Sequence, residues 1–285
     1  MVSIEKNNNI PVKNTKTNNK GTVRAIGSVY LTQIATLPVG AVILNNMPRF
    51  SKNLSKDQVE IVNKAADKVV HEVTNLGKKG VKIENFTHAG INLSGIPDKI
   101  LELTNTAVGT AAGKNAAFCA KPLGKIAANT VIVNREKLPV ATFHELGHAF
   151  NFNNSKFWGA VQKMRCPSMR LAALFAFLPA LTKDAKAENG KELTKGQKFK
   201  NGLRKASPIL AGLAMVPVLA EEGMASIRGC KWANQLLDKT LSKRVTKFNV
   251  AGFSTYVLTT AGIVLASLVG KKVKDNIQAK QEQKK

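Results

Sequence analysis

The sequence predicts a mainly α-helical protein with a small β-sheet, whose apolar helices span a membrane or dip into it. Two stretches, 25–48 and 248–270, contain no charged residue and exceed the length of about 20 residues that crosses a bilayer. Between them, apolar residues recur mainly at helical spacing, and only short β-branched segments have the composition of strands. We therefore expect a helical protein that has two candidate membrane anchors.

The chain carries an extreme positive charge. Its 285 residues include 43 Lys and Arg against 18 Asp and Glu, a formal charge of +25, and 44% are apolar, enough for a sizeable core. Such a charge indicates nucleic acid or an anionic membrane surface as a partner, or a basic tail. The basic residues are spread along the whole chain and only 6% of residues are aromatic, without the interleaved basic and aromatic pattern of nucleic-acid readers. The expected partner is membrane lipid, with no specific nucleic acid.

The first 48 residues divide into two segments. Residues 1–24 are rich in Asn and Lys, so we expect a disordered basic tail without the pattern of a signal peptide. Residues 25–48 are a candidate transmembrane helix, although Thr32, Gln33 and Pro38 also fit a buried core helix.

A helix and two strands are expected next. Ser55 is a plausible N-cap of a helix that ends near Gly77, and His71 on this helix has no second histidine at i+4, so it is expected at the surface. Residues 80–83 and 129–134 have strand composition, and a short helix at 97–105 leads to a Gly- and Ala-rich stretch at 109–113. The strand at 129–134 has two interpretations, an edge strand along a cleft or an ordinary core strand.

The stretch HELGH, residues 144–148, has the pattern of a zinc site. On a helix, His144 and His148 lie one turn apart on the same face, so both imidazoles can bind one ion. Glu145 projects beside that ion, where it can accept a proton from water. The apolar residues around the motif would bury the helix, and buried histidines and carboxylates need a partner; they are Val140, Ala141, Phe143, Leu146 and Phe150.

A catalytic zinc needs a third protein ligand, which must come from another element. Two short uncharged segments, 171–182 and 206–220, follow the motif; they are either a hairpin that dips into the membrane or core helices. Glu221 and Glu222 come directly after the second segment. A carboxylate pair there needs a positive partner, which a zinc ion supplies, although a surface pair at a helix start is the alternative.

The C-terminal part is the strongest membrane candidate. Residues 248–270 are flanked by Lys247, Lys271 and Lys272, and we expect a transmembrane helix followed by a basic tail at 271–285 that is solvated or binds headgroups. The three cysteines, at 119, 166 and 230, are odd in number and far apart, so buried free thiols in a reducing compartment are expected.

The chain resembles the membrane-embedded zinc metallopeptidases of the gluzincin type, the group that includes HtpX and the CAAX prenyl protease. The residues that carry the resemblance are the segment 115–118 (Asn-Ala-Ala-Phe), the strand and HELGH after it, the two apolar segments, and Glu222 with Ala225 in a Glu-x-x-Ala pattern. The resemblance covers roughly residues 55–229. It implies a zincin-like metalloprotease core in residues 49–247.

The resemblance also implies roles for the site residues. His144, His148 and Glu222 would hold one zinc per chain, and Glu145 would be the general base. HtpX-like members carry Asp after the alanine, whereas this chain has Ser226, which can hydrogen-bond His144 only more weakly. The oxyanion helper is left unknown; the residues considered are Tyr30, Tyr256 and Arg228.

The expected function is that of a membrane-bound zinc endopeptidase acting on a protein or peptide substrate. The expected location is an integral membrane one, with the active site on the cytoplasmic side. Two other interpretations stay open. One is an intramembrane protease of the site-2 type, in which HExxH lies in a transmembrane helix and a later Asp, here Asp238, is a ligand. The other is a basic membrane-anchored protein that binds lipid headgroups or a partner and holds a structural zinc.

Overall fold

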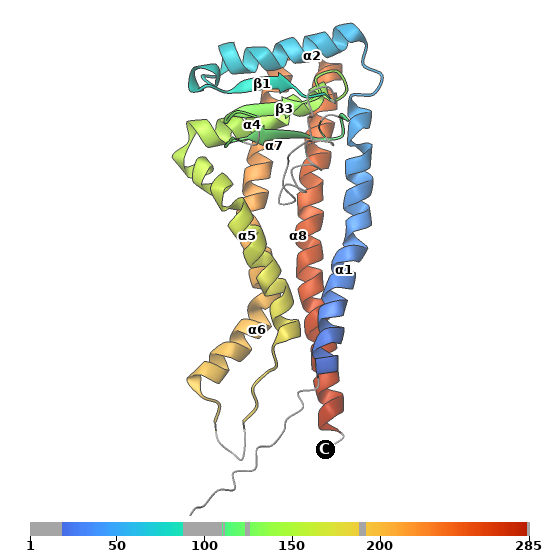
Figure 1. Ribbon diagram of the computed structural model, residues 1–285, viewed down its shortest axis with the longest axis vertical. Helices are drawn as coiled ribbons and strands as arrows, with labels where there is room; N and C mark the ends of the chain where they lie inside the picture. The colour runs from blue at the N-terminus through green and yellow to red at the C-terminus, as the bar shows by residue number, and fades with distance from the viewer. Residues whose placement is uncertain (1–18, 88–109, 111, 123–125, 188–191, 284–285) are drawn as a thin grey trace, which may run out of the picture.

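The computed structural model describes residues 19–87, 110, 112–122, 126–187 and 192–283, which form an elongated and mainly helical molecule with one small sheet (Figure 1). One helix, α2, lies across one end, and long helices run away from it toward the other end. The helices are α1 (Asn19–Asn46), α2 (Lys56–Lys68), α4 (Thr142–Asn154), α5 (Lys156–Leu181), α6 (Lys195–Ala214), α7 (Val216–Leu236) and α8 (Lys239–Glu282). The predicted fold class, mainly α with a small sheet, is confirmed.

The sheet has three strands in the order β1-β3-β2, formed by Lys82–Asn85, Thr130–Val133 and Ala116–Cys119 respectively. β1 runs parallel to β3, with Lys82 opposite Thr130, and β2 runs antiparallel to it. All four residues of β3 are buried. The strand expected at 129–134 is therefore the central strand, and β1 and β2 are the two outer strands of the described sheet. The sequence did not predict β2 as a strand.

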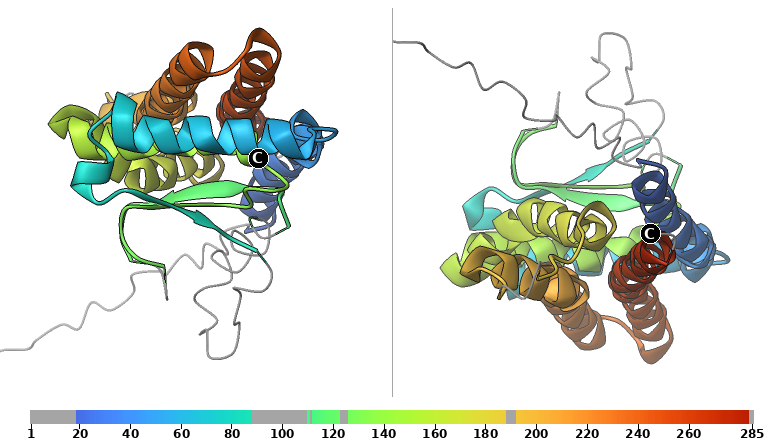
Figure 2. Two further views of the ribbon diagram at one scale, coloured as in Figure 1. Left: turned by 90° about the horizontal axis from the view of Figure 1, so that it is seen from above. Right: turned by 90° about the horizontal axis from the view of Figure 1, so that it is seen from below.

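The main core lies at the same end of the molecule as the sheet. Seen from above and below, α2 and α4 form a layer that has the sheet on one side and α7 and α8 on the other (Figure 2). Ser55 is the N-cap of α2, as predicted, and the structure shows that it forms a capping box with Gln58. The buried apolar residues of this core include Val62, Val69, Leu76, Val131, Leu138, Phe143, Leu146, Trp232 and Leu241.

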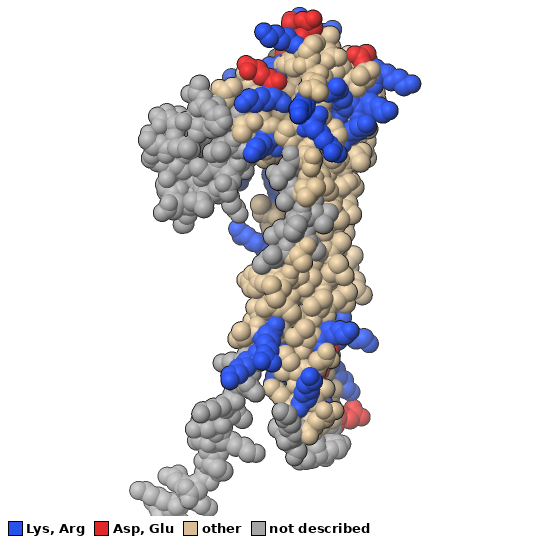
Figure 3. Space-filling view, turned by 90° about the vertical axis from the view of Figure 1, so that its right-hand side faces the viewer, with Lys and Arg blue, Asp and Glu red and all other residues tan. Residues whose placement is uncertain are grey.

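Two helical stretches among the described residues are long and apolar enough to cross a membrane. They are 195–236, which combines α6 and α7, and α8. Only 33% and 17% of their most apolar windows are buried inside the protein, whereas a core helix of a soluble protein is mostly buried. Lys and Arg gather at the two ends of the face in Figure 3, and the surface between them is nearly free of charge.

The two short apolar segments belong to longer helices than the sequence predicted. Residues 171–182 are the second half of α5, and 206–220 joins the end of α6 to the start of α7 around Met215. Three of the flanking charged residues, Arg170, Lys205 and Glu221, lie inside the helices, whereas α5 ends at Leu181, just before Lys183. The helices around 206–220 are therefore not limited to the span of about 22 Å that its 15 residues give.

Both predicted tails contain helix. α1 begins at Asn19, inside the expected disordered tail, because its first turns pack on α8, where Lys274 donates to Thr22. α8 continues to Glu282, so the expected basic tail is helical in its described part, and all of its described residues except Lys274 are exposed or half-buried. There Asp275 pairs with Arg204, which is fully buried and also pairs with Asp184.

Some expectations fall outside the described residues. They are the first 18 residues, the short helix at 97–105, and residues 109 and 111 of the stretch at 109–113. In α1 the same holds for the side chains of residues 34, 36–41, 44 and 45, so a membrane crossing by 25–48 stays a prediction. The three cysteines are free; Cys119 is buried as expected, but Cys166 is exposed and Cys230 is half-buried.

Candidate metal centre

The centre forms where α4 and α7 cross in direct backbone contact. A Cβ at Gly147 would lie 2.3 Å from the carbonyl oxygen of Ala225, and one at Gly229 would lie 2.7 Å from that of Phe143. Larger residues would force the two helices apart at both points. The glycine inside HELGH therefore lets α7 approach α4 closely enough for their side chains to share one site.

Three potential ligand atoms face one another across this contact. The Nε2 atoms of His144 and His148 are 3.1 Å apart, and the Oε2 of Glu222 lies 3.2 Å from the first and 3.5 Å from the second. At bond lengths of about 2.0–2.1 Å, tetrahedral ligands lie roughly 3.3–3.4 Å apart. The three atoms therefore have the spacing of one face of a zinc tetrahedron.

The other ring nitrogens of the histidines have partners of their own. Glu221 Oε1 lies 2.7 Å from Nδ1 of His148 and also accepts from Asn151 Nδ2 at 3.1 Å. Ser226 Oγ lies 3.3 Å from Nδ1 of His144. A proton held on each Nδ1 leaves the Nε2 lone pair free for an ion. The adjacent glutamates therefore have different positions. The carboxylate of Glu222 lies beside the Nε2 atoms of both histidines, whereas that of Glu221 contacts Nδ1 of His148, on the other edge of the ring.

Arg165 of α5 joins both glutamates and was not predicted as a site residue. Its guanidinium contacts Glu221 Oε2 at 3.1 Å, Glu222 Oε1 at a short distance, and the hydroxyl of Tyr256 at 3.4 Å. Glu221 and Glu222 are fully buried, so the surface-pair alternative is wrong. The positive partner that the sequence argument assigned to zinc is supplied in part by Arg165.

The charges of the centre match a divalent cation. Three buried carboxylates, those of Glu145, Glu221 and Glu222, stand against one guanidinium, that of Arg165. Two negative charges are left over when both histidines are neutral, and buried charges need compensation. Without an ion, burial lowers the pKa of His148, but the carboxylates of Glu222 and Glu221 outweigh it and raise that pKa to about 10. His148 then supplies part of the missing positive charge as an imidazolium.

A pocket of about 300 Å³ opens onto the ligand atoms. Glu145 lies on its wall, with a carboxylate oxygen within 4.8 Å of a ring nitrogen of each histidine. β2 and its preceding residue, Asn115, line another side, and α8 contributes Thr255 and Tyr256. The candidate membrane helix α8 is thus part of the site. Segment 115–118, which carries part of the resemblance, overlaps β2 and lies beside the pocket.

Several other candidates lie elsewhere. Tyr30 packs on Phe177 with its ring centre 5.0 Å away, and the guanidinium of Arg228 lies over the ring of Phe150. Asp238 accepts hydrogen bonds from the backbone of Thr240 and Leu241 at the start of α8, so it is a helix cap and not a metal ligand. Of the three helper residues considered, only Tyr256 reaches the pocket.

Cys119 of β2 is not poised as a ligand or a nucleophile. Burial, together with the negative charges of Glu145 and Glu84, raises the pKa of its thiol to about 11. The thiol of Cys119 stays protonated at neutral pH.

Comparisons of the chain with protein-family models, with curated proteins and with solved structures find no match. Any assignment of function therefore has to be argued from this site.

Proposed function

We propose that the protein is a membrane-bound, zinc-dependent endopeptidase of the HExxH type, similar to the gluzincin metallopeptidases. The observation that carries the proposal is the spacing of His144 Nε2, His148 Nε2 and Glu222 Oε2, which fits a tetrahedral ion with its fourth position toward a pocket. The surplus of two negative charges and the carboxylate of Glu145 beside the ring nitrogens support it. Structural zinc sites use four protein ligands, whereas catalytic sites use three and leave one position open.

The membrane placement is supported by two features. The stretches 195–236 and 239–282 are long, apolar and mostly unburied. Large apolar side chains on them are exposed, for example Leu213, Val257 and Leu265, at 58%, 44% and 50% respectively. Hydrocarbon chains would cover these residues, and the Lys and Arg at both ends of the molecule would meet the headgroups (Figure 3). We place the site on the cytoplasmic side because all three thiols are free.

The chain's own residues divide the work of hydrolysis. Zinc, when bound, acts as a Lewis acid toward a scissile carbonyl and makes a water molecule acidic enough to attack at neutral pH. Glu145 takes the proton of the attacking water and delivers it to the leaving amine nitrogen. Arg165 donates to the phenol oxygen of Tyr256, and the Tyr256 hydroxyl is also within hydrogen-bonding reach of Glu222. We assign this hydroxyl to hydrogen-bond the negative charge that develops on the carbonyl oxygen.

Substrate binding is assigned to β2. Among the described residues, this strand is hydrogen-bonded to β3 alone, and its residues 116–118 line the pocket. An extended peptide could add to the free side of β2 through main-chain hydrogen bonds. The scissile bond would then lie next to Glu145 and the ligand atoms.

The geometry disfavours a protease of the site-2 type. α4 has 13 residues, about 20 Å, which is too short to cross a bilayer. Asp238, the later acidic residue considered as a ligand, caps α8 instead. The remaining alternative, a non-catalytic lipid- or partner-binding protein, lacks a role for Glu145.

The test is zinc content and proteolysis of the detergent-purified protein. Zinc per chain would be measured for wild type, Glu222→Gln, Glu221→Gln and Glu145→Gln, and hydrolysis would be followed with labelled casein. We expect about one zinc in wild type, none in Glu222→Gln, and zinc held roughly 10–100-fold more weakly in Glu221→Gln. Glu145→Gln should keep its zinc and lose hydrolysis.

Thermal unfolding of each variant separates loss of zinc from loss of fold. A folded wild type without zinc would refute the metal centre. Zinc-loaded Glu145→Gln that hydrolyses casein as fast as wild type would refute the role of Glu145, and with it the catalytic proposal.

A further inference from the structure

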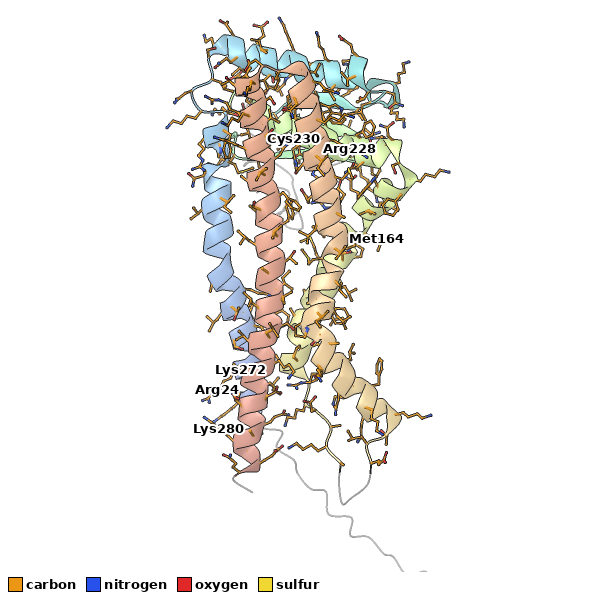
Figure 4. All side chains as sticks on the ribbon, turned by 180° about the vertical axis from the view of Figure 1, so that it is seen from behind. Arg24, Met164, Arg228, Cys230, Lys272 and Lys280 are labelled. Carbon is orange, nitrogen blue, oxygen red and sulfur yellow. The ribbon has the colours of Figure 1, made fainter. Side chains whose placement is uncertain are left out.

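A second hollow lies on the outer side of the α7–α8 pair. It has a volume of about 700 Å³, and small residues of α7 line it, namely Gly223, Ser226 and Cys230. Figure 4 shows Cys230 on the side of α7 that faces α8, and Arg228 on the opposite side. Phe253 of α8 lies against Gly223, with a ring carbon 3.4 Å from the position of an added Cβ. The small residues therefore leave a groove between two apolar helices.

The walls of this α7–α8 groove are apolar and outward-facing. Ile227 is 63% exposed and Val250 is 60% exposed, and both line the groove. In water such side chains would cost free energy in proportion to their exposed apolar area. A hydrocarbon occupant would remove that cost.

The polarity of the groove changes along its length. Lys231, Asn234 and Gln235 line it toward the end of α7, where α8 begins, whereas Phe253 and Gly223 line it farther from that end. Lys231 is its one charged lining residue among those described. Lys and Arg gather at this end of the molecule, and the nearly uncharged band begins below it (Figure 3). A membrane lipid has the same order, with a polar head at the surface and an apolar chain inward.

We propose that the α7–α8 groove binds one anionic phospholipid, with its headgroup at Lys231 and an acyl chain running toward Phe253. The volume lies within the range of ligand sites, roughly 300–1,000 Å³. The cationic end and apolar walls select for an anionic amphiphile over a peptide or a soluble anion. The inference rests on the proposed membrane placement and does not depend on the peptidase activity.

The groove and the metal centre share residues. Ser226 lines the groove and contacts His144, and Asn249 lines both hollows and donates to the carbonyl oxygen of Ser226 at 3.3 Å. A lipid in the groove would therefore pack against Ser226, which contacts His144, and against Asn249, which holds the backbone of Ser226.

The test uses the native cysteines of the full chain. Cys230 lines the groove, whereas Cys166 is exposed on α5 and serves as the internal control. Labelling of both by N-ethylmaleimide would be followed by peptide mass spectrometry in detergent, with phosphatidylglycerol or phosphatidylcholine added. We expect phosphatidylglycerol to slow labelling of Cys230 at about fivefold lower concentration than phosphatidylcholine, the effect of one basic residue at an anionic surface. Cys166 should label at the same rate throughout.

Two variants locate the headgroup and the chain. Lys231→Gln should remove the preference for phosphatidylglycerol, and Val250→Trp, which fills the groove, should slow Cys230 labelling without lipid. The absence of any protection would overturn the lipid site, and equal protection by both lipids would overturn the anionic headgroup. A preference that persists in Lys231→Gln would also contradict the proposal. Zinc content and casein hydrolysis, measured on the same samples, report on the metal centre separately.

Discussion

Replacing Gly147 by alanine tests the contact on which the metal centre depends. The added Cβ would lie 2.3 Å from the carbonyl oxygen of Ala225, and an ordinary contact begins at 3.4 Å. The helices α4 and α7 must therefore separate by about 1 Å, and such overpacking costs about 1–3 kcal/mol of stability. Zinc bond lengths tolerate deviations of about 0.2 Å. Because His144 and His148 lie on one helix and Glu222 on the other, the variant should lose its tetrahedral spacing.

The assay is zinc affinity by chelator competition, together with the unfolding temperature. We expect Gly147→Ala to bind zinc at least 100-fold more weakly, beyond the roughly 10–100-fold that loss of a supporting contact costs. Gly202→Ala is the matched control, because no atom lies within 4 Å of its added Cβ in α6. It should be neutral or slightly stabilising, since alanine is the better helix former. Wild-type zinc affinity in Gly147→Ala would refute the close crossing of α4 and α7.

Three further predictions concern other parts of the molecule. The pKa of His148 is raised from 6.5 to about 10, so its ion pairs stabilise the metal-free protein fully below pH 6.5 and are lost as the pH rises through 10. Unfolding temperatures of chelator-treated protein should fall over that range, and a flat profile would contradict the pairing. At pH 8, maleimide should label exposed Cys166 long before Cys119, whose thiol pKa is raised to about 11; equal rates would contradict the buried position of β2. Asp238→Ala should cost about 1 kcal/mol of stability through loss of the α8 cap and leave zinc content unchanged. Loss of zinc in that variant would restore Asp238 as a ligand.

The elements that the sequence predicted well are those with local signals. The N-cap residue Ser55 marks the start of α2, and HELGH places His144 and His148 on one helical face through its spacing alone. The ends of α1 and α8 were predicted less well. Their terminal turns are polar, and they are helical because they pack on each other, as at Lys274 and Thr22. No local pattern reports such a contact.

The residues of the candidate site also divide into those that a local sequence pattern marks and those that depend on contacts between distant segments. Glu222 and Ser226 could be suggested from their pattern, and the structure places both against His144. Arg165 could not, because its partners lie 56 and 57 residues away on α7 and nothing near it in the sequence marks it. The requirement that a buried carboxylate pair needs a cation was the available signal. It predicted that a cation was needed, but it did not distinguish a metal ion from a guanidinium.

The pairing of α1 with α8 has a consequence for synthesis. The helices lie side by side along much of their length, and Val29 of α1 fits against Gly270 of α8, where a Cβ would lie 2.4 Å from its methyl group (Figure 1). The ribosome makes the first of these helices nearly two hundred residues before it begins the second. At about 5–20 residues per second, α1 waits for roughly 10–40 s before its neighbour exists. During that interval another molecule, such as an insertion factor or a lipid, must cover the side of α1 that later packs on α8. The native packing of α1 forms only after α8 has been synthesised.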